Sequence, residues 1–248
     1  MEIQGNKLAP YDCIFINGDS YSAPHQDRKV YGDFLGEFFN VPVKNYAVAG
    51  SNNDRILRTS IEFLNQLKTE YKNPLVIIGW SFITRLEVWD QRDDEELPIL
   101  KKIPDRKYFP GSKFIGLDHL INTNSATLEQ KALLANNPHS HKQLMNFFTN
   151  AYMFGHMLEL LNFDYFLFSA ANNKHFSPDK FPAINLYSQV QWVDNNKKMH
   201  RLGDFCVQQW ANANDLECSP ITGHLSENGH KKFATVLLDI IKEQYGNV

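Results

Sequence analysis

Apolar runs and amphipathic segments alternate over the first 80 residues, and this alternation restricts the possible folds more than any other feature of the chain. Residues 12–17, 41–48 and 75–79 have the composition of strands, the first and last being short apolar runs. Between them, residues 30–39 and a segment from Asn52 or Asn53 to about Tyr71 carry apolar side chains at helical spacing. The order strand, helix, strand, helix, strand predicts an α/β fold with a doubly wound parallel sheet.

The segment from about residue 85 to residue 140 interrupts the alternation. It contains Pro98, Pro104, Pro110 and Pro138 and shows no sustained period. A long irregular connection inside a compact domain is usually a lid or a binding insertion. We therefore expect an insertion after the third strand that shapes one side of a pocket. The acidic run at 90–96 is interpreted as a solvated face rather than a cation site.

Regular patterning returns at His141 and continues to the end of the chain. A long helix is predicted from there to about Leu161, a fourth strand at 163–169, a polar loop at 170–200 and helical structure at 205–213. Ser226 is expected to cap a last helix. No internal repeat or low-complexity tract is visible, so the prediction is a single domain over residues 1–248.

The helical patterns also predict which side chains enter the core. The pairs Phe38-Phe39 and Phe147-Phe148 are expected inside, as are the apolar residues of the second helix, Ile56, Ile61, Leu64 and Leu67. Cys13 is expected to be a small core residue. The tryptophans Trp80, Trp89 and Trp192 could line a sugar or acyl pocket or could roof the core, and the sequence leaves both possibilities open.

Composition excludes several classes of function. A net charge of -3 shows no basic bias for nucleic acid, and no apolar run is long enough to cross a membrane. The first residues lack the layout of a signal peptide. Three widely spaced cysteines, Cys13, Cys206 and Cys218, argue against a disulfide framework or a zinc site. We expect no cofactor and a cytoplasmic or virion-associated protein, while its oligomeric state stays unpredicted.

Polar side chains follow the predicted strands at the points where ligands bind in open parallel sheets, beyond the carboxyl ends. Ser20 follows the first strand, Gly50 and Asn52 the second, and Ser81 the third, while His224 precedes the last helix. A serine hydroxyl is a weak nucleophile until a base takes its proton. The oxyanion that then develops needs preorganised donors, often backbone amides. This set of residues favours a serine hydrolase.

The same residues resemble the blocks of the SGNH/GDSL hydrolase superfamily over nearly the whole chain. Gly18-Asp19-Ser20 is similar to the block that carries the nucleophile, and Gly50 in Ala47-Val48-Ala49-Gly50-Ser51-Asn52 to the glycine whose amide is an oxyanion donor. His224 in Gly223-His224-Leu225-Ser226 is similar to the catalytic base. The resemblance implies a three-layer α/β/α, flavodoxin-like fold and activity on esters. Divergent relatives of this style occur in tailed bacteriophages and marine bacteria.

The sequence departs from the family pattern at two positions. The third block usually supplies an asparagine to the oxyanion hole, whereas the matching position here is Ser81. Ser81, Asn52 or Asn53 could donate instead. The acid that usually lies two or three residues before the base is also missing, since Thr222 stands there. The remaining Ser20–His224 pair would work as a dyad, with Thr222, Glu217 or Glu227 able to orient the imidazole.

We therefore expect a serine-dependent hydrolase of an ester or acyl group, and deacetylation of a carbohydrate is one reaction of this kind. Its oxyanion donors would be the amides of Ser20 and Gly50, helped by Ser81 or an asparagine, with Asp19 holding the Ser20 turn. The alternative is a catalytically silent module of the same fold that binds carbohydrate or has a structural role. A nucleotide-binding flavodoxin-like protein is disfavoured because no glycine-rich phosphate loop follows the first strand. His230 is expected to be structural, and His139 and His141 to lie on the surface.

Overall fold

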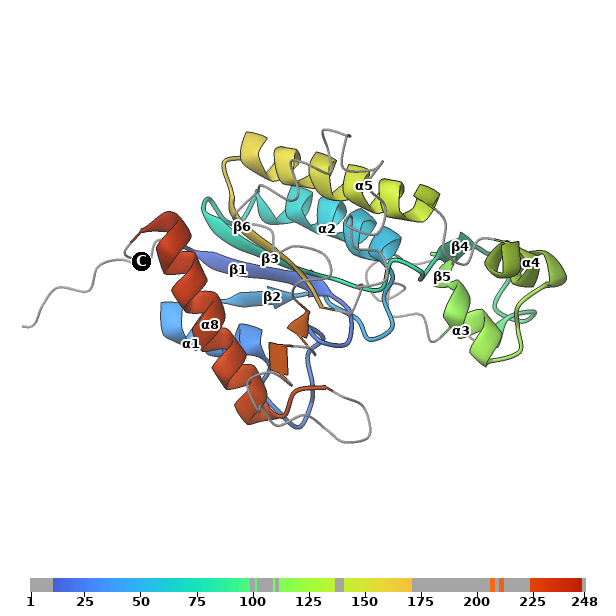
Figure 1. Ribbon diagram of the computed structural model, residues 1–248, viewed down its shortest axis with the longest axis horizontal. Coiled ribbons are helices and arrows are strands. Elements are labelled where there is room, and N and C mark those ends of the chain that lie inside the picture. Colours follow the sequence, from blue (N-terminus) through green and yellow to red (C-terminus); the bar gives the residue numbers. More distant parts are fainter. Residues whose placement is uncertain are drawn as a thin grey trace, which may run out of the picture.

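The computed structural model describes residues 11–98, 101, 109, 112–136, 141–170, 206–207, 210–211 and 224–246. Its centre is a four-stranded parallel sheet in the order β2-β1-β3-β6. The strands are β1 (Cys13–Gly18), β2 (Val43–Asn45), β3 (Pro74–Trp80) and β6 (Asp164–Ser169). Helices α2 (Asn53–Leu67) and α5 (His141–Leu160) cover one face, and α1 (Tyr31–Phe39) and α8 (Glu227–Tyr245) cover the other (Figure 1). The protein therefore has the predicted three-layer α/β/α fold.

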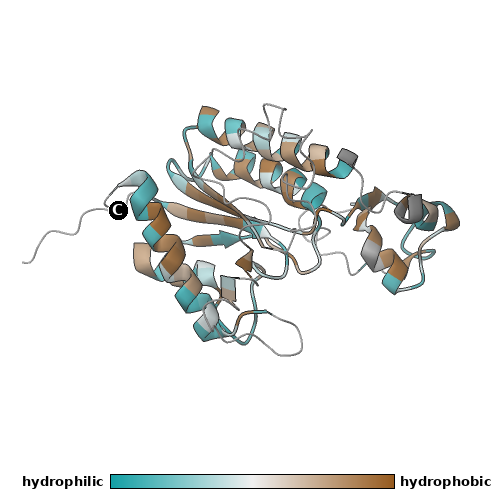
Figure 2. Cartoon of the chain, in the orientation of Figure 1, coloured by the Kyte–Doolittle hydropathy of each residue, from teal (hydrophilic) through white to brown (hydrophobic). Residues whose placement is uncertain are grey.

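Successive residues of β1 supply the two hydrophobic layers of the core. Cys13 and Phe15 pack in the cluster under α2 and α5, whereas Ile14 and Ile16 pack in the cluster under α1 and α8. A strand buried on both faces has no polar side, which explains why it appears in the sequence as a continuous apolar run (Figure 2). Burial raises the pKa of the Cys13 thiol to about 12, which keeps the thiol protonated and inert.

The prediction that Phe38 lies in the core is wrong, because α1 faces the sheet with a different stripe. Phe38 is 53% exposed, and Lys242 of α8 lies over its ring. The helix instead turns Gly32 and Gly36 toward the strands. A Cβ atom at Gly32 would lie 2.2 Å from Cδ1 of Ile16, so the missing side chain is what allows this close approach. Hydrophobic periodicity gives glycine little weight and therefore misplaces the buried face.

Helix α2 buries most of its expected face, with one exception. Ile56, Leu64 and Leu67 are buried, but Ile61 is 36% exposed. Ile61 borders a groove between α2 and the segment that follows β3, together with Phe109 and Phe114. The helix is also shorter than predicted, since its side-chain N-cap is Asn52 and its last residue is Leu67. The second strand is likewise limited to Val43–Asn45, because only these residues pair with β1.

The segment after β3 contains short elements that lie beyond the end of the sheet (Figure 1). Strands β4 (Glu87–Trp89) and β5 (Phe114–Gly116) pair antiparallel, and helices α3 (Leu117–Asn122) and α4 (Leu128–Asn136) follow. They enclose a separate small hydrophobic cluster formed by Leu97, Ile115, Leu117, Leu120 and Ala126. Strands of three residues are too short to leave a periodic signal. Of the tryptophans, Trp80 is buried in the main core and Trp89 is exposed, while Trp192 lies outside the described residues.

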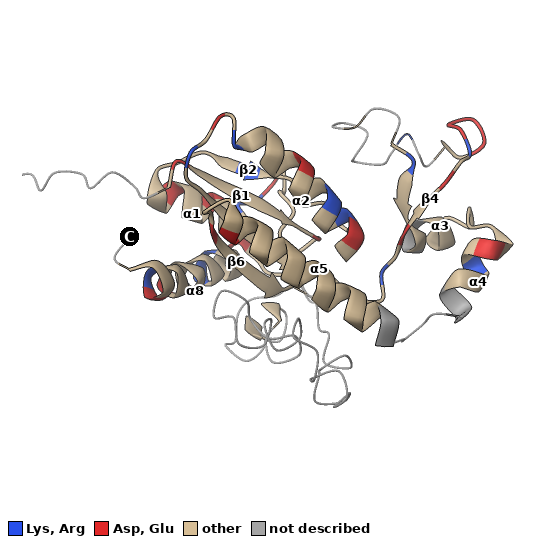
Figure 3. Cartoon of the chain, turned by 90° about the horizontal axis from the view of Figure 1, so that it is seen from above, with Lys and Arg blue, Asp and Glu red and all other residues tan. Residues whose placement is uncertain are grey.

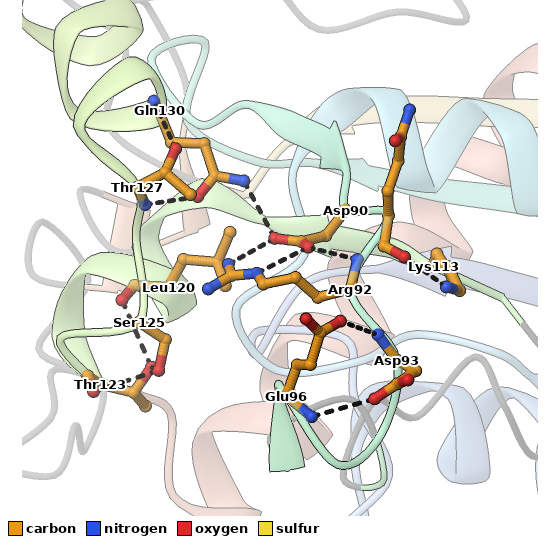
Figure 4. Close-up of polar contacts among 11 residues, drawn as sticks. Asp90, Arg92, Asp93, Glu96, Lys113, Leu120, Thr123, Ser125, Thr127 and Gln130 are labelled. Carbon is orange, nitrogen blue, oxygen red and sulfur yellow. Dashed lines mark hydrogen bonds and ion pairs between the residues drawn. The ribbon is translucent and has the colours of Figure 1, made fainter.

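The acidic run is not uniformly solvated, which corrects the sequence interpretation at Asp90. The loop after β4 carries a group of acidic residues on its outer edge (Figure 3), but Asp90 itself is only 3% exposed. Its carboxylate accepts hydrogen bonds from Nε and Nη2 of Arg92, at 2.9 and 2.6 Å, and from Nε2 of Gln130 on α4 at 3.0 Å (Figure 4). The bonds from Arg92 hold the pKa of Asp90 at about 2. Asp90 therefore ties the β4 loop to α4.

Candidate active site

Ser20 stands in a tight turn immediately after β1. The amides of Ser22 and Ala23 both donate to the carbonyl oxygen of Asp19, at 3.0 and 2.9 Å, and this closes the turn. Ser20 is half-buried, whereas Asp19 before it is fully buried. The chain thus presents one serine hydroxyl at the carboxyl end of a central strand, where ligands bind in open α/β sheets.

Asn17 anchors this turn from inside the protein. Its side-chain Nδ2 donates to the carbonyl oxygen of Ile56, to Oγ1 of Thr59 and to Oγ of Ser60, all on α2. Its Oδ1 accepts from the Gly18 amide at 2.8 Å. These bonds fix the last residues of β1 against α2, so that the Ser20 turn starts from a rigid support. A polar residue within an apolar strand was the sequence signal for this role, and sequence reasoning missed it.

His224 lies just before α8, and the start of that helix fixes its position. Ser226 is the N-cap and accepts from the Gly229 amide at 3.1 Å, while Leu225 is buried in the core. These neighbours direct the imidazole toward β1. Nε2 of His224 is 2.7 Å from Oγ of Ser20, and the Tyr21 ring lies 4.8 Å from the imidazole, centroid to centroid. Residues 204 positions apart are thereby brought into hydrogen-bond contact.

The surroundings of His224 favour its neutral form. Burial lowers the pKa of the imidazole below its usual value, and the positive charges of Arg28, His25 and Arg85 lower it further. In the neutral ring one nitrogen is an acceptor, so Nε2 can accept the Ser20 proton when Nδ1 carries the hydrogen. The pair therefore lies at hydrogen-bond distance, and the lowered pKa of the imidazole favours the form whose ring nitrogen can accept a proton. Thr222 and Glu217, two of the groups expected to orient the base, lie outside the described residues.

The Asp19 side chain is buried, and its partners come from its own turn and from the segment after β3. Its Oδ1 accepts from the Tyr21 amide at 3.1 Å, and its Oδ2 accepts from Oγ of Ser81 at 2.8 Å. Nη1 of Arg85 lies 3.6 Å from the same oxygen. Burial raises the pKa of Asp19, and the two hydrogen bonds and the Arg85 charge oppose that shift. Asp19 therefore links the turn after β1 to the loop after β3.

The candidate oxyanion donors do not all face the dyad. Ser81 is fully buried, and its hydroxyl donates to Asp19. Oδ1 of Asn52 caps α2 by accepting from the Arg55 amide at 2.8 Å. Asn53 exchanges two hydrogen bonds with the backbone of Ser81, and its side chain is thereby committed.

The two backbone candidates differ from these side chains. Gly50 adopts a positive φ of 79° in the turn after β2, a conformation that favours glycine. Within the part of the chain that the structure describes, we find no hydrogen bond donated by the amide of Gly50 or by that of Ser20. Both amides therefore remain candidate donors to a substrate oxygen.

The other histidines and the cysteines add no further centre within the described residues. His230 is buried on α8, and burial together with nearby positive charges lowers its pKa to about 3. Cys13 and Cys206 are buried and are not joined by a disulfide, and Cys218 lies outside the described part. The described residues contain no group of three or more His, Cys, Asp or Glu side chains able to hold a metal ion. His139 and the His141 side chain lie outside the described part.

The described helices include none that is both long and apolar enough to cross a membrane.

Comparison with protein families places the chain in one of them. A family of unknown function, DUF6071, matches residues 24–196, and the protein belongs to this family. The match begins after Ser20 and ends before His224. No curated protein matches the chain significantly. Among solved structures, the chain is similar to the acetyl xylan esterase AlAXEase, with 12% identity, a TM-score of 0.46 and coverage of 92% of this chain and 98% of that one. A similarity this distant supports no conclusion about the reaction.

Proposed function

We propose that the protein is a serine-dependent hydrolase of an ester or acyl group, of the SGNH type, in which Ser20 is the nucleophile and His224 the general base. The observation that carries the proposal is the 2.7 Å contact between Nε2 of His224 and Oγ of Ser20. Three features of the surroundings add support. A lowered pKa favours the neutral imidazole, the serine follows a central strand, and the amides of Ser20 and Gly50 remain candidate donors.

The proposed reaction has two halves. Oγ of Ser20 bonds to the acyl carbon while its proton moves to Nε2 of His224, and the carbonyl π electrons move onto the oxygen. The tetrahedral species collapses, the bond to the alcohol oxygen breaks, and the leaving alcohol takes the proton from His224. Water then attacks the acyl-enzyme in the same way, again losing a proton to His224. The bond between the acyl carbon and Oγ of Ser20 then breaks, Oγ takes the proton back from His224, and the acid leaves.

A serine-directed fluorophosphonate probe tests the proposal directly. We expect covalent labelling of Ser20 in the wild-type protein, together with turnover of a short-chain aryl ester. Ser20→Ala should abolish both, since it removes the attacking oxygen, and the thermal unfolding midpoint should hardly change because Ser20 is not a core residue. His224→Ala should lower both by several orders of magnitude.

Two results would contradict the proposal. Turnover that survives Ser20→Ala would show that another nucleophile acts. A folded wild-type protein with neither labelling at Ser20 nor esterase activity would instead favour the silent module that keeps the fold and has lost turnover.

A further inference from the structure

Arg85 is the charged residue that joins the three loops around the proposed nucleophile. Its Nη1 donates to Oγ of Ser81 at 2.9 Å and to the carbonyl oxygen of Ser51 at 3.3 Å, and lies 3.6 Å from Oδ2 of Asp19. These partners follow β3, β2 and β1 respectively. The Arg85 side chain is 24% exposed and its guanidinium lies over the ring of Phe82, 4.8 Å from the centroid. Arg85 therefore reaches the carboxyl end of the sheet from the segment after β3.

Two of the partners of Arg85 adjoin the amides expected to bind the substrate oxygen. Asp19 precedes Ser20, and Ser51 follows Gly50. The third partner, Ser81, stands where a longer asparagine would supply a side-chain donor. The Ser81 hydroxyl does not replace that donor, because it donates to Asp19. The Arg85 guanidinium donates to the Ser81 hydroxyl, and its positive charge is among those that lower the pKa of His224.

We propose that Arg85 is the third, cationic component of the oxyanion hole, taking the place that an asparagine at position 81 would fill. The inference rests on the proposed function. When Oγ of Ser20 bonds to the acyl carbon, negative charge develops on the carbonyl oxygen and the serine proton goes to His224. A fixed positive charge in a partly buried site stabilises this oxygen more than it stabilises the neutral ester, which is the condition for raising the rate.

A structural role for Arg85 is the competing explanation. Asp19 is a buried carboxylate, and Arg85 supplies one of the charges that compensate for its burial. Removing Arg85 could then lower activity only by disturbing Asp19. The two roles predict different effects of removing Arg85 from the Asp19→Asn protein. Its neutral side chain at position 19 no longer needs the Arg85 charge, so a purely structural role would be lost there. If Arg85 acts on the oxyanion, its removal slows the reaction by a similar factor whether residue 19 is Asp or Asn.

The experiment measures the second-order rate of fluorophosphonate labelling at Ser20, corrected for the folded fraction of each variant. The set is wild type, R85M, R85K, D19N and the R85M/D19N double variant. Phosphonylation develops negative charge on the phosphoryl oxygen, so it depends on the same donors as ester hydrolysis. We expect R85M to slow labelling roughly 10²-fold, as removal of one oxyanion donor does, and R85K to slow it less. R85M should slow the D19N protein by a similar factor.

Arg58→Met is the matched control. Arg58 is also partly buried, pairs with Glu87 at 2.8 Å and lies over the Phe114 ring, but it stands on α2 away from the loops that hold Ser20. Its labelling rate should stay within about twofold of wild type. Ester kinetics provide a second readout, since loss of an oxyanion donor lowers kcat with little change in KM.

The outcomes separate this inference from the proposed function. If wild type does not label at Ser20, the proposed function and the role of Arg85 fail together. If wild type labels and R85M labels equally fast per folded molecule, only the Arg85 proposal fails. It also fails if the R85M effect disappears in the D19N background, because Arg85 would then act only by compensating Asp19.

Discussion

Replacing Asn17 by alanine tests how the turn that presents Ser20 is supported. The Asn17 side chain is fully buried and makes four hydrogen bonds, three to α2 and one from the Gly18 amide. Alanine would remove all four bonds and leave a space that water cannot readily fill. We expect the variant to fold with a lower free energy of unfolding.

The expected loss can be estimated from the partners left behind. Thr59 Oγ1 keeps its own bond to the Arg55 carbonyl, so it loses little. The Ser60 hydroxyl and the Gly18 amide are both buried and each loses the Asn17 partner. A buried polar group that loses its partner costs about 1–3 kcal/mol. The sum, with some relaxation, is a loss of about 2–4 kcal/mol.

Urea unfolding followed by tryptophan fluorescence measures this loss as a lower midpoint with an unchanged slope. The matched control is Asn65→Ala, because Asn65 lies on an exposed position of α2, and its effect should stay within about 0.5 kcal/mol. A midpoint for Asn17→Ala as high as that of Asn65→Ala would refute the reasoning. It would mean that the four bonds do not stabilise the folded state relative to the unfolded chain.

Two further predictions concern pH. The reaction needs the neutral His224 ring, and the pKa of that ring is lowered, so the acid limb of the kcat/KM profile should lie below pH ~6.5. Arg28 is among the charges that lower this pKa, so Arg28→Gln should move the acid limb to higher pH. An unshifted limb would show that Arg28 does not act on the base. His230 has a folded-state pKa of about 3, well below its unfolded value of about 6.5, so the unfolded chain binds the proton more readily. Its contribution to stability is therefore present above pH ~6.5 and is lost as pH falls toward 3, with a slope of at most about 1.4 kcal/mol per pH unit. His230→Phe should flatten this slope in urea unfolding measured across that range, and an identical slope in both proteins would contradict the assignment.

The sequence alone determined the layers and the order of the main elements. Strands β1 and β3 are buried on both faces, so they appear as apolar runs, and the amphipathic helices between them force parallel crossovers. The same pattern placed Ser20 at a strand end and His224 before the last helix. These predictions depend on local composition and on rules of connectivity, and both can be applied to a chain without knowing its packing.

Tertiary structure decided the features that depend on which residues from distant segments meet. Phe38 is exposed because glycines turn α1 toward the sheet, and Asp90 is buried because Arg92 and Gln130 surround its carboxylate. The commitment of Ser81 to Asp19, and the approach of Arg85 to both, come from loops after different strands. Their side chains have no sequence periodicity that relates them. Hydrophobic patterning predicts which residues are buried. Hydrogen-bond partners depend on the distances between donor and acceptor atoms of distant segments, and these distances are determined only when the sheet has assembled.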